Sequence, residues 1–235
     1  MGLLDELKQE ADSLLVRQRA SQEELNGKLR AAHDRLNEAL QYYVQLFNSL
    51  NIVKPQIRRS YYIEGSSRLE NLLQCDYNVN GRRLTVENHE YVDAIVLRLR
   101  CVGTAQLEIE KDSQILVDRL REHLWSHGLK FNVRESRREG AYIDRGHFSI
   151  NPEVTVNITL EADIEHAQVK ISIRNLERLG EYVYVYDYDE VGPELLEEVG
   201  RAILNKPHKL RTIGRRQAGN LMSRASSGVE RRAAS

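Results

Sequence analysis

The chain is poor in cysteine and has no long apolar run. Its 235 residues include two cysteines, Cys75 and Cys101, which are too few for a disulfide framework and favour a reducing compartment. No apolar stretch reaches the ~18 residues that a membrane-spanning helix needs. The N-terminal stretch carries acidic side chains where a secretion signal has a basic region and then an apolar one. We therefore expect a soluble, cytoplasmic protein without a transmembrane segment.

Sequence motifs of the common enzyme classes are missing as well. The chain has no glycine-rich phosphate loop, no Gly-x-Ser-x-Gly motif and no Cys-x-x-Cys pair. His123 and His127 are four residues apart on a predicted helix, but no third metal ligand is close to them in the sequence. We expect no catalytic residues, no metal and no cofactor, and we interpret the protein as non-enzymatic.

Positive charge is concentrated at the C-terminal end. The formal net charge is -1, yet residues 206–235 carry eight Lys or Arg and one Glu. This stretch is polar and lacks apolar periodicity, which predicts a disordered basic tail. Such a tail can contact nucleic acid or acidic lipid weakly, through phosphate charges alone. We expect deletion of residues 210–235 to leave the melting temperature unchanged.

Residues 1–50 are predicted to be helical. Apolar positions in their second half alternate spacings of three and four, which is the coiled-coil rhythm. A capping-box pattern at 21–24 leaves two alternatives open, one long helix or a helical pair broken near residue 20. The apolar stripe packs either on the sheet of the same chain or against a second subunit. Its residues are Leu29, Ala32, Leu36, Ala39, Tyr43, Leu46 and Leu50.

Residues 51–205 predict an α+β domain in which helices flank an antiparallel β-sheet. Asn80–Gly81 lies between two strand-like runs and predicts a hairpin turn, because both central positions of a type I′ turn require positive φ. Helices are expected just before Gly128 and from Pro193 to Asn205. Since the strands follow one another through short links, we predict antiparallel pairing and not a doubly wound parallel sheet.

One short pattern, "EGSSRLENLLQCDYNV", resembles the nucleotidyltransferase signature. Gly65–Ser66 stand where that signature opens a helix toward a triphosphate, and Asp76 stands where the first metal-binding carboxylate lies. Asn78 takes the place of the second carboxylate and would be a neutral, weaker ligand. The resemblance implies a degenerate nucleotidyltransferase-like domain, while turn and strand formation explains the same residues without any catalysis.

Four tyrosines recur at every second position of a predicted strand: Tyr182, Tyr184, Tyr186 and Tyr188. They share one face because a strand sends alternate side chains to opposite sides. We interpret Val183 and Val185, on the other face, as the core side. A row of four rings needs a cover, and three covers are open: the N-terminal helix, a second subunit or a small ligand.

Taken together, these patterns predict an interaction or assembly protein that self-associates, or packs, through its N-terminal helix. The regions are a helical segment (1–50), an α+β domain (51–205) and a basic tail (206–235), and the partner is a homo-oligomer mate or another protein. The alternative is a small-ligand-binding module that uses the tyrosine face, and the third interpretation is the nucleotidyltransferase-like domain. The expected interaction residues are Leu29, Leu36, Tyr43, Leu46 and Leu50.

Overall fold

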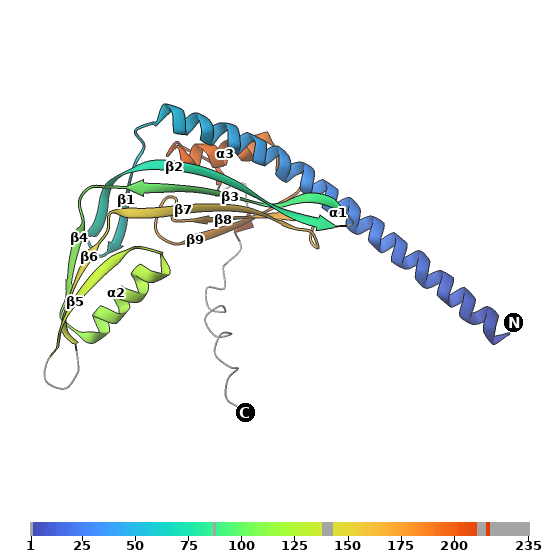
Figure 1. The fold of residues 1–235 in the computed structure, drawn as a ribbon, viewed down its shortest axis with the longest axis horizontal. Helices are drawn as coiled ribbons and strands as arrows, with labels where there is room; N and C mark the ends of the chain where they lie inside the picture. The colour runs from blue at the N-terminus through green and yellow to red at the C-terminus, as the bar shows by residue number, and fades with distance from the viewer. Residues whose placement is uncertain (1, 87, 138–142, 211–214, 217–235) are drawn as a thin grey trace, which may run out of the picture.

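The fold is one long helix followed by a curled antiparallel sheet and two shorter helices (Figure 1). The computed structural model describes residues 2–86, 88–137, 143–210 and 215–216. The helices are α1 (Leu3–Val53), α2 (Gln114–Ser126) and α3 (Pro193–Ile203). The strands are β1 (Arg58–Glu64), β2 (Ser67–Val86), β3 (His89–Val102), β4 (Leu107–Lys111), β5 (Phe131–Arg137), β6 (Ile143–Ile150), β7 (Glu153–Asp163), β8 (Gln168–Arg174), β9 (Glu181–Asp187) and β10 (Arg215–Arg216).

The strands form two antiparallel sheets. The larger has the order β1-β2-β3-β7-β8-β9-β10, and the smaller has the order β4-β6-β5. Neighbours in the chain are mostly neighbours in a sheet, as short links between antiparallel strands require. The predicted α+β class, with a long N-terminal helix ahead of an antiparallel sheet and flanking helices, is confirmed.

α1 is a single continuous helix, so the alternative of a pair broken near residue 20 is wrong. Its C-terminal half packs on β2 and β3 and touches α3. The apolar stripe from Leu29 to Leu50 lies in this contact, where Leu36, Ala39 and Tyr43 are completely buried. The stripe therefore faces the chain's own sheet over these residues, and a coiled-coil seam is not needed to account for its spacing.

The N-terminal half of α1 extends past the end of the sheet as a free-standing arm (Figure 1). We define the arm as residues 7–25, all of which are exposed. Gly27 lies between the arm and Leu29, the first buried residue of the helix. A β-carbon at Gly27 would meet no atom within 4 Å, so close packing does not explain this glycine.

The predicted hairpin turn at Asn80–Gly81 is wrong. Both residues lie inside β2, where Gly81 pairs with Ile95 of β3. A β-carbon on Gly81 would come within 2.9 Å of Leu40 Cδ2, so glycine here lets α1 approach the strand closely. The β2–β3 connection comes later, and Asn88 there has a φ of 65°, a conformation that asparagine tolerates better than most residues.

α3 covers the same face of the large sheet as α1 (Figure 1). Tyr43 of α1 donates its hydroxyl to the carbonyl of Leu196 in α3 at 3.3 Å. The C-terminal end of α3 is held by Arg59 of β1, which donates to the carbonyls of Ala202 at 2.6 Å and Ile203 at 3.2 Å. A cation at the negative end of a helix is favourable electrostatically.

The chain past α3 remains part of the packed body. Leu210 is 2% exposed, and β10 pairs with Tyr184 and Val185 of β9. The predicted boundary of a disordered tail at residue 206 is therefore wrong for residues 206–210. Residues 211–214 and 217–235, on which most of the rest of that prediction falls, lie outside the described residues.

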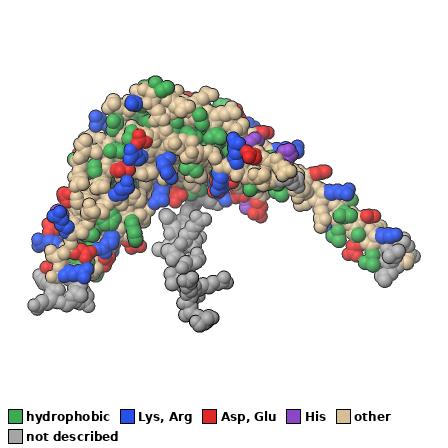
Figure 2. Space-filling model, in the orientation of Figure 1, with side chains coloured by type: hydrophobic (Ala, Val, Ile, Leu, Met, Phe, Trp, Pro, Cys, Tyr) green, Lys and Arg blue, Asp and Glu red, His purple; other side chains and the backbone are tan. Residues whose placement is uncertain are grey.

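The smaller sheet and α2 form a leg at the opposite end of the molecule from the arm. Figure 2 shows the resulting outline, an arch whose crown is the large sheet with α1 and α3. Val117, Leu120 and Leu124 are the buried face of α2. A β-carbon on Gly146 of β6 would lie 2.6 Å from Val117 Cγ2, so the helix sits very close to the sheet at this point.

Candidate functional site

The arm exposes apolar side chains that nothing in the described chain covers. The exposed fractions are 55% for Leu7, 51% for Leu14, 49% for Leu15, 65% for Val16 and 42% for Leu25. With 3.6 residues per turn, Leu7, Leu14 and Leu25 fall within about 60° of the direction of the buried Leu29 and Leu36. The apolar stripe of the helix thus continues beyond the sheet that covers its second half.

The predicted interaction residues lie in the packed half of α1, outside the arm. Leu29, Leu36, Tyr43 and Leu50 are at most 7% exposed against the chain's own sheet and α3. Leu46 is half-buried and lies beside Gly200 of α3. The four buried side chains of this set have no surface left for a second molecule, whereas the apolar side chains of the arm are accessible to a partner.

The tyrosine row lies on the core side of β9, so the assignment of Val183 and Val185 to the core was wrong. Tyr184 and Tyr186 pair across the strands with Ile171 and Val169, and both are at most 6% exposed. Val183 and Val185 are half-buried on the opposite face beside Ser172 and Lys170. The sequence correctly predicted that the tyrosines and the valines lie on opposite faces of the strand. The tyrosine rings, and not the shorter valine side chains, fill the space between the sheet and the helices.

Two hydroxyls of this row donate to backbone carbonyls. Tyr186 donates to the carbonyl of Leu210 at 3.4 Å, and Tyr188 donates to the carbonyl of Asp163 at 3.3 Å. Burial, followed by the nearby charge of Asp163, raises the pKa of Tyr188 to about 12. Burial likewise raises the pKa of Tyr186. These hydroxyls therefore stay protonated at neutral pH and act as hydrogen-bond donors to the chain itself.

The space beside the row is small. A cavity of about 10 Å³ lies between Tyr182, Tyr184, Ala202 of α3 and Leu210. That volume is about what one water molecule needs. The tyrosine row is thus covered by α3, by the segment after α3 and by Tyr43. Ligand binding at the row remains a prediction, and the described cavity beside it is too small for a molecule larger than water.

The nucleotidyltransferase-like residues are not brought together. Gly65 and Ser66 form the turn between β1 and β2, where Glu64 pairs with Ser67. Asp76 is ten residues farther along the same strand, or about 30 Å at the usual rise per residue. Its carboxylate forms an ion pair with Arg100 of β3. Asn78 receives a hydrogen bond from Asn80 at 2.7 Å.

Metal binding finds no cluster in the described part of the chain. The rings of His123 and His127 are 4.6 Å apart between centroids. Burial, the neighbouring His123 and Arg174 lower the pKa of His127. Among the residues that the structure describes, no group of three His, Cys, Asp or Glu side chains is placed to hold a metal ion. None of the described helices is long and apolar enough to cross a membrane.

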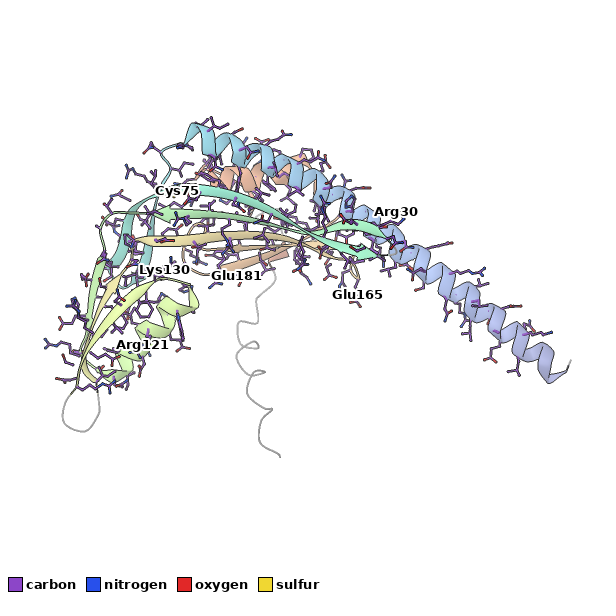
Figure 3. All side chains as sticks on the ribbon, viewed as in Figure 1. Arg30, Cys75, Arg121, Lys130, Glu165 and Glu181 are labelled. Carbon is purple, nitrogen blue, oxygen red and sulfur yellow. The ribbon has the colours of Figure 1, made fainter. Side chains whose placement is uncertain are left out.

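A second exposed apolar feature, which the sequence analysis missed, lies on the leg. Trp125, the single tryptophan of the chain, is 79% exposed although the preceding residue, Leu124, is fully buried. It stands at an open groove of about 430 Å³ between α2 and β5. We call this the α2/β5 groove, and it is lined by Arg121, Trp125, Leu129, Lys130 and Phe131. Figure 3 shows Arg121 and Lys130 on this leg, far from the arm.

The only sequence signal for this groove is the tryptophan itself, which falls outside the apolar stripe of its helix.

No protein-family model, curated protein or solved structure matches this chain.

Proposed function

We propose that this protein is a non-enzymatic assembly protein that self-associates through its N-terminal arm. The observation that carries the proposal is a set of five exposed aliphatic side chains, three of them on one face (Leu7, Leu14 and Leu25), on a helix that projects past its own sheet. A helix of about 19 residues is about 28 Å long, and most of the stability of helices in proteins comes from packing of their apolar face. A second copy of the chain supplies such a cover.

The size of the arm sets a limit on what it can do alone. Complete burial of one Leu or Val side chain contributes about 1.5–3 kcal/mol. Association costs about 4–15 kcal/mol in lost translational and rotational freedom. Five aliphatic side chains therefore support binding only if the partner surface is itself apolar and well shaped for them.

The proposal is tested by the mass of the full-length protein in solution. Light scattering after size exclusion, over a range of concentrations, should give a mass above that of the monomer. Leu7→Asp with Leu14→Asp should reduce it to the monomer mass while the helical circular dichroism of the body is kept. Ile52→Asp is the matched control, because Ile52 is 81% exposed on the same helix outside the arm. A monomeric wild type at every concentration would overturn the proposal.

A further inference from the structure

We propose that the arm of one protomer docks in the α2/β5 groove of a second copy, so that the protein assembles head to tail. This inference rests on the proposed self-association and adds to it the surface that receives the arm.

The groove has the composition of a docking site. Leu129 is 3% exposed and Phe131 is half-buried, while Trp125 stands 79% exposed beside them. Exposed tryptophan is costly to leave in water, and Trp and Arg are the residues that most often anchor protein interfaces. An amphipathic helix laid in an apolar groove is one of the recurring modes of recognition.

The charged side chains that line the groove are cations. Arg121 and Lys130 are the charged residues among those that line the groove. Arg121 is bonded to Asp118 and Glu135, which fixes its guanidinium at the wall. The ammonium of Lys130 is freer, because its side chain is 68% exposed and its ion pair with Glu153 spans 3.5 Å.

The first half of the arm carries the complementary pattern. Residues 7–14 contain two acidic residues, Glu10 and Asp12, and one Lys. Glu10 is three residues after Leu7 and four before Leu14, so the three side chains share one helix face. Leucine, carboxylate and leucine on that face match a groove with an apolar floor and a cation at its rim. Pairing of two arms is less favourable, since Gln18 and Gln22 interrupt the stripe between Leu14 and Leu25.

The protomer cannot bind its own arm in this way. The arm and the α2 leg project from opposite ends of the arch (Figure 1, Figure 3), and Arg30 in Figure 3 marks the region where α1 leaves the sheet. Each copy then offers one arm and one groove. A contact between two different surfaces is heterologous, and it produces closed rings or open filaments instead of a symmetric dimer.

The single tryptophan makes the docking directly measurable. In the full-length protein, tryptophan emission should shift to shorter wavelength and acrylamide quenching should fall severalfold over the concentrations at which light scattering shows association. Leu7→Asp with Leu14→Asp should keep the emission of an exposed indole at all of these concentrations. If the mass rises but the quenching of Trp125 does not change, the groove inference is wrong and the proposed self-association stands. If the mass never rises, both are wrong.

A mixing experiment distinguishes head-to-tail from symmetric contact. Leu14→Asp should prevent the arm from docking, and Trp125→Asp should prevent the groove from receiving an arm. Each variant alone should therefore be monomeric. Their equimolar mixture should form a dimer and nothing larger, because one intact arm and one intact groove remain. Association of the Trp125→Asp chain by itself would indicate a symmetric contact between arms, and either that result or a mixture that stays monomeric while the wild type associates would overturn the inference. Ile115→Asp, at a residue of α2 that is 74% exposed and outside the groove lining, should associate as the wild type does.

The charge match has its own test. Glu10→Lys and Lys130→Glu should each weaken association, and the chain that carries both should recover it. If the double variant does not recover association, Glu10 and Lys130 do not pair in the interface.

Discussion

The side chain of Asn51 pairs with the backbone of Tyr77 in both directions. Its Nδ2 donates to the carbonyl of Tyr77 at 2.8 Å, and the Tyr77 amide donates to Oδ1 at 3.2 Å. β1 begins at Arg58, which pairs with Leu73, so none of the described strands pairs with this edge of β2 at Tyr77. The last turn of α1 thus takes the place of a strand, and it fixes the helix relative to the sheet.

Replacing Asn51 with Ala should therefore destabilise the fold. Loss of these two partly buried hydrogen bonds is expected to lower the free energy of unfolding by about 1–2 kcal/mol. Urea unfolding followed by circular dichroism measures this difference. Asn48→Ala, at an exposed position one turn earlier on α1, is the control and should be nearly neutral. Equal effects of the two substitutions would show that the pairing with Tyr77 contributes nothing.

Gly146→Ala should strain the contact between β6 and α2. The new β-carbon would lie 2.6 Å from Cγ2 and 3.3 Å from Cγ1 of Val117, a branched side chain with little freedom to move. Overpacking of this kind costs about 1–3 kcal/mol. Val117→Ala in the same chain should recover part of the loss, and a double-mutant cycle from thermal unfolding gives the coupling between the two sites. Additive effects would argue against the contact.

Leu210 should mark the end of the stable fold. Leu210→Ala removes a buried side chain beside Tyr184 and is expected to cost about 2–5 kcal/mol. A chain that ends at residue 209 also loses the carbonyl that Tyr186 binds, so its melting temperature should fall, whereas a chain that ends at residue 216 should melt with the full-length protein. Identical melting of all three chains would contradict the packing of residues 206–210.

Asp163 should make stability depend on pH in the acid range. Hydrogen bonds from Lys170 and His166 outweigh burial and lower the pKa of Asp163 to about 2. Because the unfolded value is about 3.9, the ionised carboxylate stabilises the fold above pH ~4, and this contribution is lost as the pH falls toward about 2. Asp163→Asn should therefore be less stable than the wild type at pH 7 and should lose less stability on acidification. Urea midpoints measured across this range decide it, with the exposed Asp189→Asn as control.

Elements with a strong apolar rhythm were predictable. The stripe from Leu29 to Leu50 indicated the buried face of α1. The start of α3 was predicted correctly at Pro193, and its predicted end at Asn205 is two residues past the observed end at Ile203. What the stripe faces was not predictable, because a sheet and a second helix are equally apolar partners. The same spacing serves both.

Other features depend on distant contacts that local patterns do not contain. Asn80 and Gly81 form a dipeptide that is typical of hairpin turns. The structure instead explains the glycine by the close approach of Leu40, which is distant in the sequence. Tyrosine and valine alternate on β9, and only the depth of the space under α3 decides which of them is inside. Leu210 is buried although its surroundings in the sequence are basic and polar, and Trp125 is exposed although its helix is amphipathic.

Gly27 gives the arm a soft joint where it meets the body. Glycine in a helix interior costs about 1 kcal/mol relative to alanine, and alanine would fit here without any contact. The helix is thus most easily bent two residues before the buried Leu29, and in the proposed assembly the angle between neighbouring subunits acquires some compliance. Such compliance favours closed rings over long filaments, because small angular errors are absorbed at each joint. Gly27→Ala should stiffen the arm, so electron microscopy of the assemblies should show longer, straighter chains of subunits; an unchanged distribution of shapes would place the bending elsewhere.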